Sequence, residues 1–118
     1  MIRMIGVGDN VVDRYPQRGV LYPGGNSINF AVYGKQLGHE TAYMGVLADD
    51  REGEIIQSAL KSLGVDIAQS AFVHGETGRC TTTLTDGDRC ITDDNDFGAV
   101  KSQPLQLTPE RLDYIANF

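Results

Sequence analysis

Residues 2–74 alternate between strand-like and helix-like patterns, and this alternation limits the possible folds more than any other feature of the sequence. An apolar run over 2–8 ends at glycines, as buried strands often do. Two amphipathic segments follow, one carrying Ile28, Ala31 and Val32 and the other Ile56, Leu60 and Leu63. The predicted order is a strand at 2–8, a hairpin, a helix ending at Gly38, a strand at 41–47 and a helix ending at Gly64, followed by a strand near 71–74 that leads into more hairpin. This order predicts an α/β fold with a parallel sheet flanked by helices.

Capping residues mark where the predicted helices begin. Asn26 or Ser27 is suited to cap the first helix, and the second begins at Asp49 or Asp50. Thr108 followed by Pro109 opens a further helix, because proline is favoured in the first turn.

Two other segments are typical of β-hairpins. The first covers 11–22 and is interrupted at Pro16, which cannot donate to a ladder. The second has β-branched arms at 81–85 and 89–92 around an Asp-Gly-Asp turn. These polar hairpins do not fit inside a buried parallel layer, so we expect them to form a separate small sheet. Within it Cys90 falls opposite Thr83 or Leu84, too far from Cys80 for a disulfide.

Composition excludes several classes of function. A chain of 118 residues fits one domain, and its formal net charge of −6 argues against a nucleic-acid partner. The apolar runs are too short to span a bilayer and the N-terminus lacks a signal peptide, so no membrane association and a cytoplasmic location are expected. Two free cysteines suit a reducing compartment, and with His39 and His74 they assemble no metal site.

Two polar clusters are candidates for a binding site. Asp9, Asn10 and Asp13 follow the first strand, where ligands of open α/β sheets bind. Gly24-Gly25 is followed by Asn26 and Asn29 on the first turn of a helix. Glycines let a ligand approach the backbone and a helix start presents free N–H groups, which suits hydroxyl-rich or anionic ligands. The alternatives are a helix cap and turn-forming residues, but a short hairpin could fold the two clusters together.

Two other patterns are weaker. Gly6-x-Gly8 suggests a dinucleotide site, but the third glycine of that motif would be Val11 and no helix starts there. Residues 93–98 suggest a calcium loop, but the closing position would be Pro104 instead of glutamate. A tight turn and a solvated acidic loop explain these segments better.

Together these residues resemble the N-terminal part of the PfkB (ribokinase-like) carbohydrate kinases. The family's first signature has a Gly-Gly pair, an Asn on the opening helix, a small residue, a glycine at the helix end and a Gly-Asp-Asp-x-x-Gly segment. The matching residues are Gly24-Gly25, Asn29, Ala31, Gly38 and Ala48-Asp49-Asp50-Arg51-Glu52-Gly53. The sequence departs from the signature at Ser27, usually Gly, Ala or Pro, and at Ala48, usually Gly.

The resemblance implies a sugar-binding role for specific residues. Asp13 would accept hydrogen bonds from sugar hydroxyls, and Gly25, Asn26 and Asn29 would line the same pocket, with Asp9 and Asn10 as further candidates. Segments 8–16 and 25–33 look most like kinases of fructoselysine, so fructoselysine or a related ketose derivative is the expected substrate. The acidic residues of 93–96 could then meet the ammonium group of an amino-acid-linked sugar.

The resemblance also sets expectations for the whole domain. The hairpins at about 11–22 and 71–92 would form a β-sheet lid over the sugar, which is often a dimer contact. The family's second signature, with the catalytic base and anion hole, is absent from 1–118. We therefore expect the N-terminal part of a kinase domain, without catalytic residues of its own, with ATP and Mg²⁺ bound mainly by the C-terminal part.

Other interpretations stay open at this point. The kinase could act on another sugar, such as ribose, fructose or 2-keto-3-deoxygluconate. A second class is a truncated, non-catalytic product that binds sugar or dimerises through its lid.

Overall fold

Parallel strands flanked by helices form the centre of the molecule, as the alternating pattern predicted, in two two-stranded sheets that follow one another along the chain. The computed structural model describes the backbone of residues 1–118 and every side chain except that of residue 92. Its parallel pairs are β1 (Arg3–Val7) with β4 (Glu40–Met44) and β5 (Val46–Ala48) with β6 (Ala71–Val73). The strand expected over 41–47 is broken at Gly45 into β4 and β5. We call these paired strands the core sheet.

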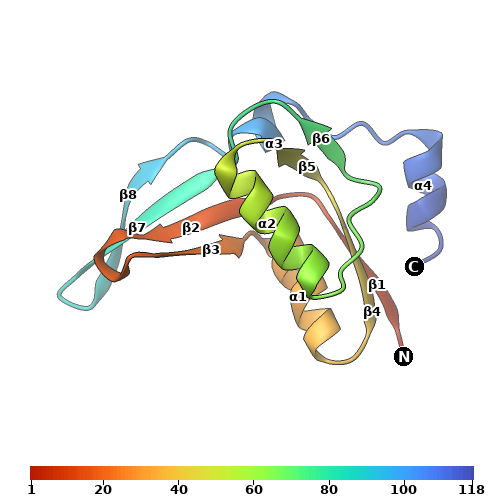
Figure 1. The fold of residues 1–118 in the computed structure, drawn as a ribbon, viewed down its shortest axis with the longest axis horizontal. Helices are drawn as coiled ribbons and strands as arrows, with labels where there is room; N and C mark the ends of the chain where they lie inside the picture. Colours follow the sequence, from red (N-terminus) through yellow and green to blue (C-terminus); the bar gives the residue numbers. More distant parts are fainter.

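Helices cover both faces of the core sheet (Figure 1). The helices are α1 (Asn26–Gln36), α2 (Arg51–Ser62), α3 (Ala99–Ser102) and α4 (Pro109–Ile115). Leu47 packs in the main core with Ile28 of α1 and Ile56 of α2. Its neighbours Val46 and Ala48 pack in a second cluster with α3. Because successive strand residues point to opposite faces, α1 and α2 lie on one side of β5 and α3 on the other.

A separate four-stranded sheet projects from one end of the core sheet (Figure 1). Its order is β3 (Val20–Gly24), β2 (Val11–Tyr15), β7 (Arg79–Thr85) and β8 (Asp88–Asp94), with a short 3-10 turn at Pro16–Arg18. We call it the outer sheet. It contains the first predicted hairpin, but only the 79–94 part of the second, because β6 pairs with β5 of the core sheet. The predicted segment 71–92 was therefore too long at its start.

The start of α1 differs from the prediction. Neither Asn26 nor Ser27 caps the helix; the N-cap position is Gly25, and no side chain of its own segment caps it. Asp50 caps α2 and Thr108 caps α4, as predicted. The predicted core stripe of α2 also ends early, because Leu63 is 41% exposed.

The two sheets are connected by polar contacts around the start of α2. The Arg14 side chain of β2 forms an ion pair with Glu52 in the first turn of α2. The Asp50 carboxylate accepts hydrogen bonds from the backbone N–H groups of Gly53 and Thr77. Since Thr77 leads into β7, the cap of α2 also fixes the entry to the outer sheet.

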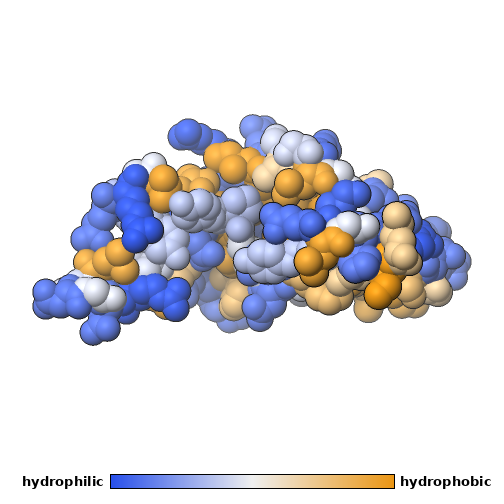
Figure 2. Space-filling model, turned by 90° about the horizontal axis from the view of Figure 1, so that it is seen from below, coloured by the Kyte–Doolittle hydropathy of each residue, from blue (hydrophilic) through white to orange (hydrophobic). Residues whose placement is uncertain are grey.

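The surface is divided along the long axis of the molecule. Figure 2 shows the end of the outer sheet as mostly hydrophilic, while apolar patches lie over the half with the helices and core sheet. On α1 the exposed apolar side chains are Phe30, Tyr33 and Leu37. Among the helices described, none has the length and apolar content needed to cross a membrane.

Candidate functional site

Asp13 lies where three cavities meet. It lines a cavity of about 440 Å³ between the outer sheet and helices α1 and α2. It also lines two cavities, of about 240 and 370 Å³, on the β7 and β8 side of the outer sheet. A Cβ at Gly24 would overlap Asp13 Oδ2, so a larger residue at this position would displace the carboxylate. Burial raises the pKa of Asp13 above its usual value, and the charge of Arg89 opposes this shift. Asp13 is thus a partly desolvated acceptor facing open space.

A row of side chains crosses the outer sheet at Asp13. Asp13 is paired with Tyr22 of β3 and with Cys80 of β7, and Cys80 is paired with Asp94 of β8. Side chains at paired positions of neighbouring strands share a face. Asp13, Cys80 and Asp94 accordingly line one cavity of about 240 Å³.

The acidic segment 93–96 is only partly available to a ligand. Asp93 is paired with Arg79 and Asp96 with Lys101. The Asp94 Oδ1 atom accepts a hydrogen bond of 2.7 Å from the backbone N–H of Asp96. Of the three carboxylates, only Asp94 lines a cavity with Asp13.

Asp9 holds the start of α1 from a distance in the sequence. Its carboxylate accepts hydrogen bonds from the backbone N–H of Asn26 at 3.2 Å and of Ser27 at 3.1 Å, and from Ser27 Oγ at 3.0 Å. Gly25 adopts φ of +104°, which favours glycine, and its α-carbon lies beside Asp9 and Asn10. Asp9 therefore performs the capping role that was predicted for Asn26 or Ser27.

Asn10 is a buried structural residue. It is 1% exposed, and its Nδ2 donates to Tyr43 Oη at 2.9 Å and to the Val46 carbonyl at 2.7 Å. The Tyr43 hydroxyl in turn donates to the Gly8 carbonyl at 2.7 Å. Burial raises the pKa of Tyr43, so this hydroxyl stays protonated. Sequence reasoning missed Tyr43, since a tyrosine in a strand pattern gives no signal of this contact.

The two asparagines of α1 are placed differently. Asn29 lines the largest of the three cavities together with Asp13. Asn26 is exposed on the first turn, and its backbone N–H is engaged by Asp9. The structure thus places Asp13 and Asn29 on one cavity, and it places Gly25 beside Asp9 and Asn10.

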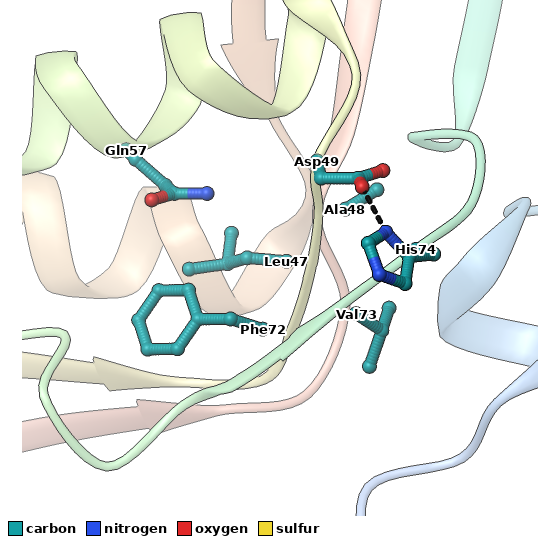
Figure 3. Close-up of a pocket in the computed structure, with 7 residues that line it drawn as sticks. All are labelled: Leu47, Ala48, Asp49, Gln57, Phe72, Val73 and His74. Atoms are coloured by element: carbon teal, nitrogen blue, oxygen red, sulfur yellow. Dashed lines mark hydrogen bonds and ion pairs between the residues drawn. The ribbon is translucent and has the colours of Figure 1, made fainter.

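A smaller cavity of about 120 Å³ lies at the carboxyl ends of β5 and β6 (Figure 3). Asp49 and His74 lie side by side at one end of it and are hydrogen-bonded (Figure 3). The pKa of Asp49 is lowered, first by its hydrogen bond with His74 and then by the N–H of Gly75. No sequence pattern predicted this pair, because 25 residues separate its members.

The described side chains include no group of three or more His, Cys, Asp or Glu residues that could hold a metal ion. The residues present thus provide hydrogen-bonding partners for a polar ligand around Asp13.

Comparison with known proteins gives consistent matches. The sequence matches the pfkB family of carbohydrate kinases over residues 1–118. It is 35% identical to the fructosamine kinase FrlD of Bacillus subtilis over 116 residues, covering 98% of this chain and 41% of that protein. It is 37% identical to the fructoselysine 6-kinase of Escherichia coli over 87 residues, covering 74% of this chain and 33% of that protein.

A solved structure supports the same fold. The fructokinase of Vibrio cholerae superposes with a TM-score of 0.70 at 30% identity, covering 78% of this chain and 33% of the fructokinase. The chain therefore spans between a third and about two fifths of the length of the relatives it matches.

Proposed function

Because this chain belongs to the pfkB family of carbohydrate kinases, we propose that it forms the sugar-binding side of a kinase that transfers phosphate from ATP to a fructosamine such as fructoselysine. The observation that carries this proposal is the position of Asp13, a partly desolvated carboxylate where three cavities meet. The matches to a fructosamine kinase and a fructoselysine 6-kinase support the choice of sugar.

Asp13 and Asn29 suit the recognition of a polyol. A carboxylate accepts hydrogen bonds from hydroxyl groups, and an amide can both donate and accept. Asp13 is set on a strand and Asn29 on a helix, and both lie on the same cavity. Groups on rigid elements hold a sugar in one orientation, which lowers the entropic part of the barrier to phosphoryl transfer. In this proposal Gly25 and Asn26 complete the pocket, while Asp9 and Asn10 act by holding its frame.

The Asp13 carboxylate favours an amine-bearing sugar over a free ketose. The nitrogen of a fructosamine is attached beside the sugar ring and carries a proton at neutral pH. Asp13 and Asp94 stand in one row across the outer sheet, on β2 and β8, and line the same cavity with Arg79. An ammonium group beside Asp13 would form a charge-assisted hydrogen bond with this carboxylate, and Asp94 would add a more distant negative charge.

The remaining parts of the reaction belong to the whole protein. We propose that the outer sheet acts as a lid that keeps water from the bound sugar and provides a contact between two copies of the protein. ATP and Mg²⁺ would be bound, and the catalytic base provided, mainly by the C-terminal part of the kinase domain. Residues 1–118 cover about two fifths of the length of the Bacillus subtilis fructosamine kinase. A cytoplasmic location without membrane or nucleic-acid partners is part of the same proposal.

The test is ATP turnover by the full-length kinase across fructoselysine, other fructosamines, fructose, ribose and 2-keto-3-deoxygluconate. We expect the highest kcat/KM with a fructosamine. Asp13→Asn should lower kcat/KM by roughly 10- to 100-fold, because hydrogen bonds to a charged group contribute about 1.5–3 kcal/mol. Asp86→Asn, in the exposed turn between β7 and β8, is the matched control and should leave turnover unchanged.

Three results would contradict parts of the proposal. Turnover with none of these sugars would exclude the kinase function, and a preference for ribose or free fructose would exclude the fructosamine assignment. Equal effects of Asp13→Asn and Asp86→Asn would exclude the role of Asp13.

A further inference from the structure

A groove leads away from the candidate sugar site between α1, α2 and β3. It has a volume of about 440 Å³, and Asp13 and Asn29 lie at its polar end. The rest of its lining is mostly apolar. It is formed by Ile28 and Val32 of α1, Ala59 and Leu60 of α2, Leu63 just after α2, Pro23, and the rings of Tyr22 and Tyr33. Gln36 lines the groove near the end of α1.

The groove has a direction set by α1. Asn29, Val32 and Gln36 follow an i, i+3, i+7 spacing, so they lie along one face of the helix. Seven residues of α-helix advance about 10 Å. The groove therefore offers a polar group at the sugar site, an apolar stretch, and an amide about two turns further on.

The exposed position of Leu63 has its explanation here. The stripe of α2 predicts a buried residue at 63, but this side chain is 41% exposed and lines the rim of the groove. Ala59 leaves room beside it because its side chain is a single methyl group. Apolar surface exposed in this way next to a polar site is typical of ligand-binding clefts.

We propose that this groove holds the aliphatic substituent of the sugar, a straight alkyl chain attached through an amine to the ketose. This inference rests on the proposed function and adds the part of the substrate beyond the sugar. The sugar hydroxyls and the amine lie at Asp13 and Asn29, and four methylene groups, about 6 Å when extended, lie along Val32, Ala59 and Leu63. The polar end of the amino acid reaches Gln36, whose amide can donate and accept hydrogen bonds.

The occupant follows from the pattern of the lining. A free sugar has no apolar part that would gain from leaving water, whereas an alkyl chain gains with every methylene group that it buries. A charged substituent with no chain would leave the apolar walls uncovered. An aliphatic chain with polar groups at both ends matches the groove at each point.

The first experiment measures kcat/KM of the full-length kinase with one sugar head and substituents of increasing length. The substrates are fructose and the fructosamines of methylamine, butylamine and the side-chain amine of lysine. We expect kcat/KM to rise about threefold or fourfold for each added methylene group, which is roughly 30-fold or more between the methylamine and butylamine adducts.

The second experiment fills the groove. Ala59→Leu adds volume inside it, and Ser58→Leu adds the same side chain at the neighbouring exposed position outside the groove. We expect Ala59→Leu to lower kcat/KM for fructoselysine at least tenfold more than for the methylamine adduct. Ser58→Leu should not change the ratio between the two substrates. Leu63→Ser removes one rim of the groove and should lower the same ratio without filling it.

The outcomes separate this inference from the proposed function. Phosphorylation of fructose and the methylamine adduct, with no gain from a longer chain, overturns the groove assignment and leaves the kinase intact. Equal losses with both substrates in Ala59→Leu, as expected if another part of the polypeptide occupies the groove, overturn it as well. Turnover with no fructosamine overturns both.

Discussion

At the scale of single residues, the site depends on a carboxylate that is costly to keep charged. Asp13 is partly withdrawn from water, and burial raises its pKa. Because its pKa is higher in the folded chain than in the unfolded chain, folding is disfavoured once the carboxyl ionises. The stability of the fold therefore decreases as pH rises through the folded-state pKa of Asp13, while its ability to accept hydrogen bonds increases.

We therefore predict that replacing Asp13 changes stability and sugar binding in opposite directions. Asp13→Asn should raise Tm at neutral pH by about 1–3 °C, since the amide has no charge to desolvate. The same change should weaken sugar binding. It should also remove a pH dependence that we expect of the wild type, whose affinity for sugar should decrease as pH falls through the pKa of Asp13. Thermal unfolding and titration calorimetry over the acidic range measure the two effects. A lower Tm at neutral pH in the variant would contradict the argument.

Tyr43 carries a second prediction at this scale. Its hydroxyl is the partner of both Asn10 and the Gly8 carbonyl inside the core. Tyr43→Phe leaves these two groups without that partner, so we expect a loss of about 1–3 kcal/mol in the free energy of unfolding. Tyr114→Phe is the control, because the Tyr114 hydroxyl contacts Asp66 at the surface, and it should cost less than about 1 kcal/mol.

The measurement is urea unfolding of both variants, together with the KM for sugar of the full-length kinase. We expect KM to rise in Tyr43→Phe with little change in kcat, because the segment from Gly8 to Asp13 loses an anchor. If Tyr43→Phe and Tyr114→Phe have the same free energy of unfolding, then Asn10 and the Gly8 carbonyl find other hydrogen-bond partners in the Tyr43 variant.

Sequence patterns placed some of the predicted binding residues correctly and did not reveal the contacts of others. Asp13 and Asn29 stand in short polar motifs beside glycines, and the structure places both on one cavity. The role of Asp13 and Asn29 in binding sugar stays a prediction. Asp9 and Asn10 stand in the same motif, but their side chains face α1 and Tyr43. Spacing shows that polar residues cluster at a strand end, but it does not show which way each one points.

At the scale of elements, the two main helices start in different ways. The cap of α2 is local, since Asp50 accepts from Gly53 three residues on. The cap of α1 comes from Asp9, which is 17 residues before Asn26. A local pattern therefore predicted the first turn of α2 correctly and misassigned that of α1. The break between β4 and β5 at Gly45 was also missed. A Cβ at Gly45 would overlap the Gly8 carbonyl, which is 37 residues earlier in the chain and leaves no local pattern.

The remote cap predicts a difference between two substitutions at Asp9. Asp9→Ala removes the acceptor for Asn26, Ser27 and the Ser27 hydroxyl, and should lower the free energy of unfolding by about 1–2 kcal/mol. Asp9→Asn keeps one acceptor oxygen and should lose less than half as much. Urea unfolding of both variants tests this. If Asp9→Asn and Asp9→Ala are equally destabilised, the charge of Asp9 matters more than its hydrogen bonds.

At the scale of the whole molecule, the site is formed between two sheets that are joined at a few points. Arg14 contacts Glu52, and Thr77 contacts Asp50, so the outer sheet is attached to the start of α2. The alternation of strands and helices predicted the α/β class and the separate sheet correctly. Only the structure shows that β6 belongs to the core sheet, because pairing between distant strands leaves no local pattern.

The two cysteines report on which face of the outer sheet binds the ligand. Cys80 lies between Asp13 and Asp94 and lines two of the cavities. Cys90 is exposed and directly precedes Ile91, which lines the cavity face, so alternation points Cys90 to the opposite face. The two thiols are therefore a matched pair, one inside the candidate site and one outside it.

We expect sugar to protect Cys80 from alkylation and to leave Cys90 unaffected. With fructoselysine at ten times its Kd, iodoacetamide labelling of Cys80 in the full-length kinase should slow about tenfold, because only the free fraction reacts. Peptide mass spectrometry measures the rate at each cysteine, with Cys80→Ser and Cys90→Ser confirming the assignment. Equal protection of both thiols would indicate a change in the whole outer sheet, such as dimer formation. Protection of Cys90 alone would place the sugar on the opposite face, since a ligand at Asp13 cannot cover it without also covering Cys80.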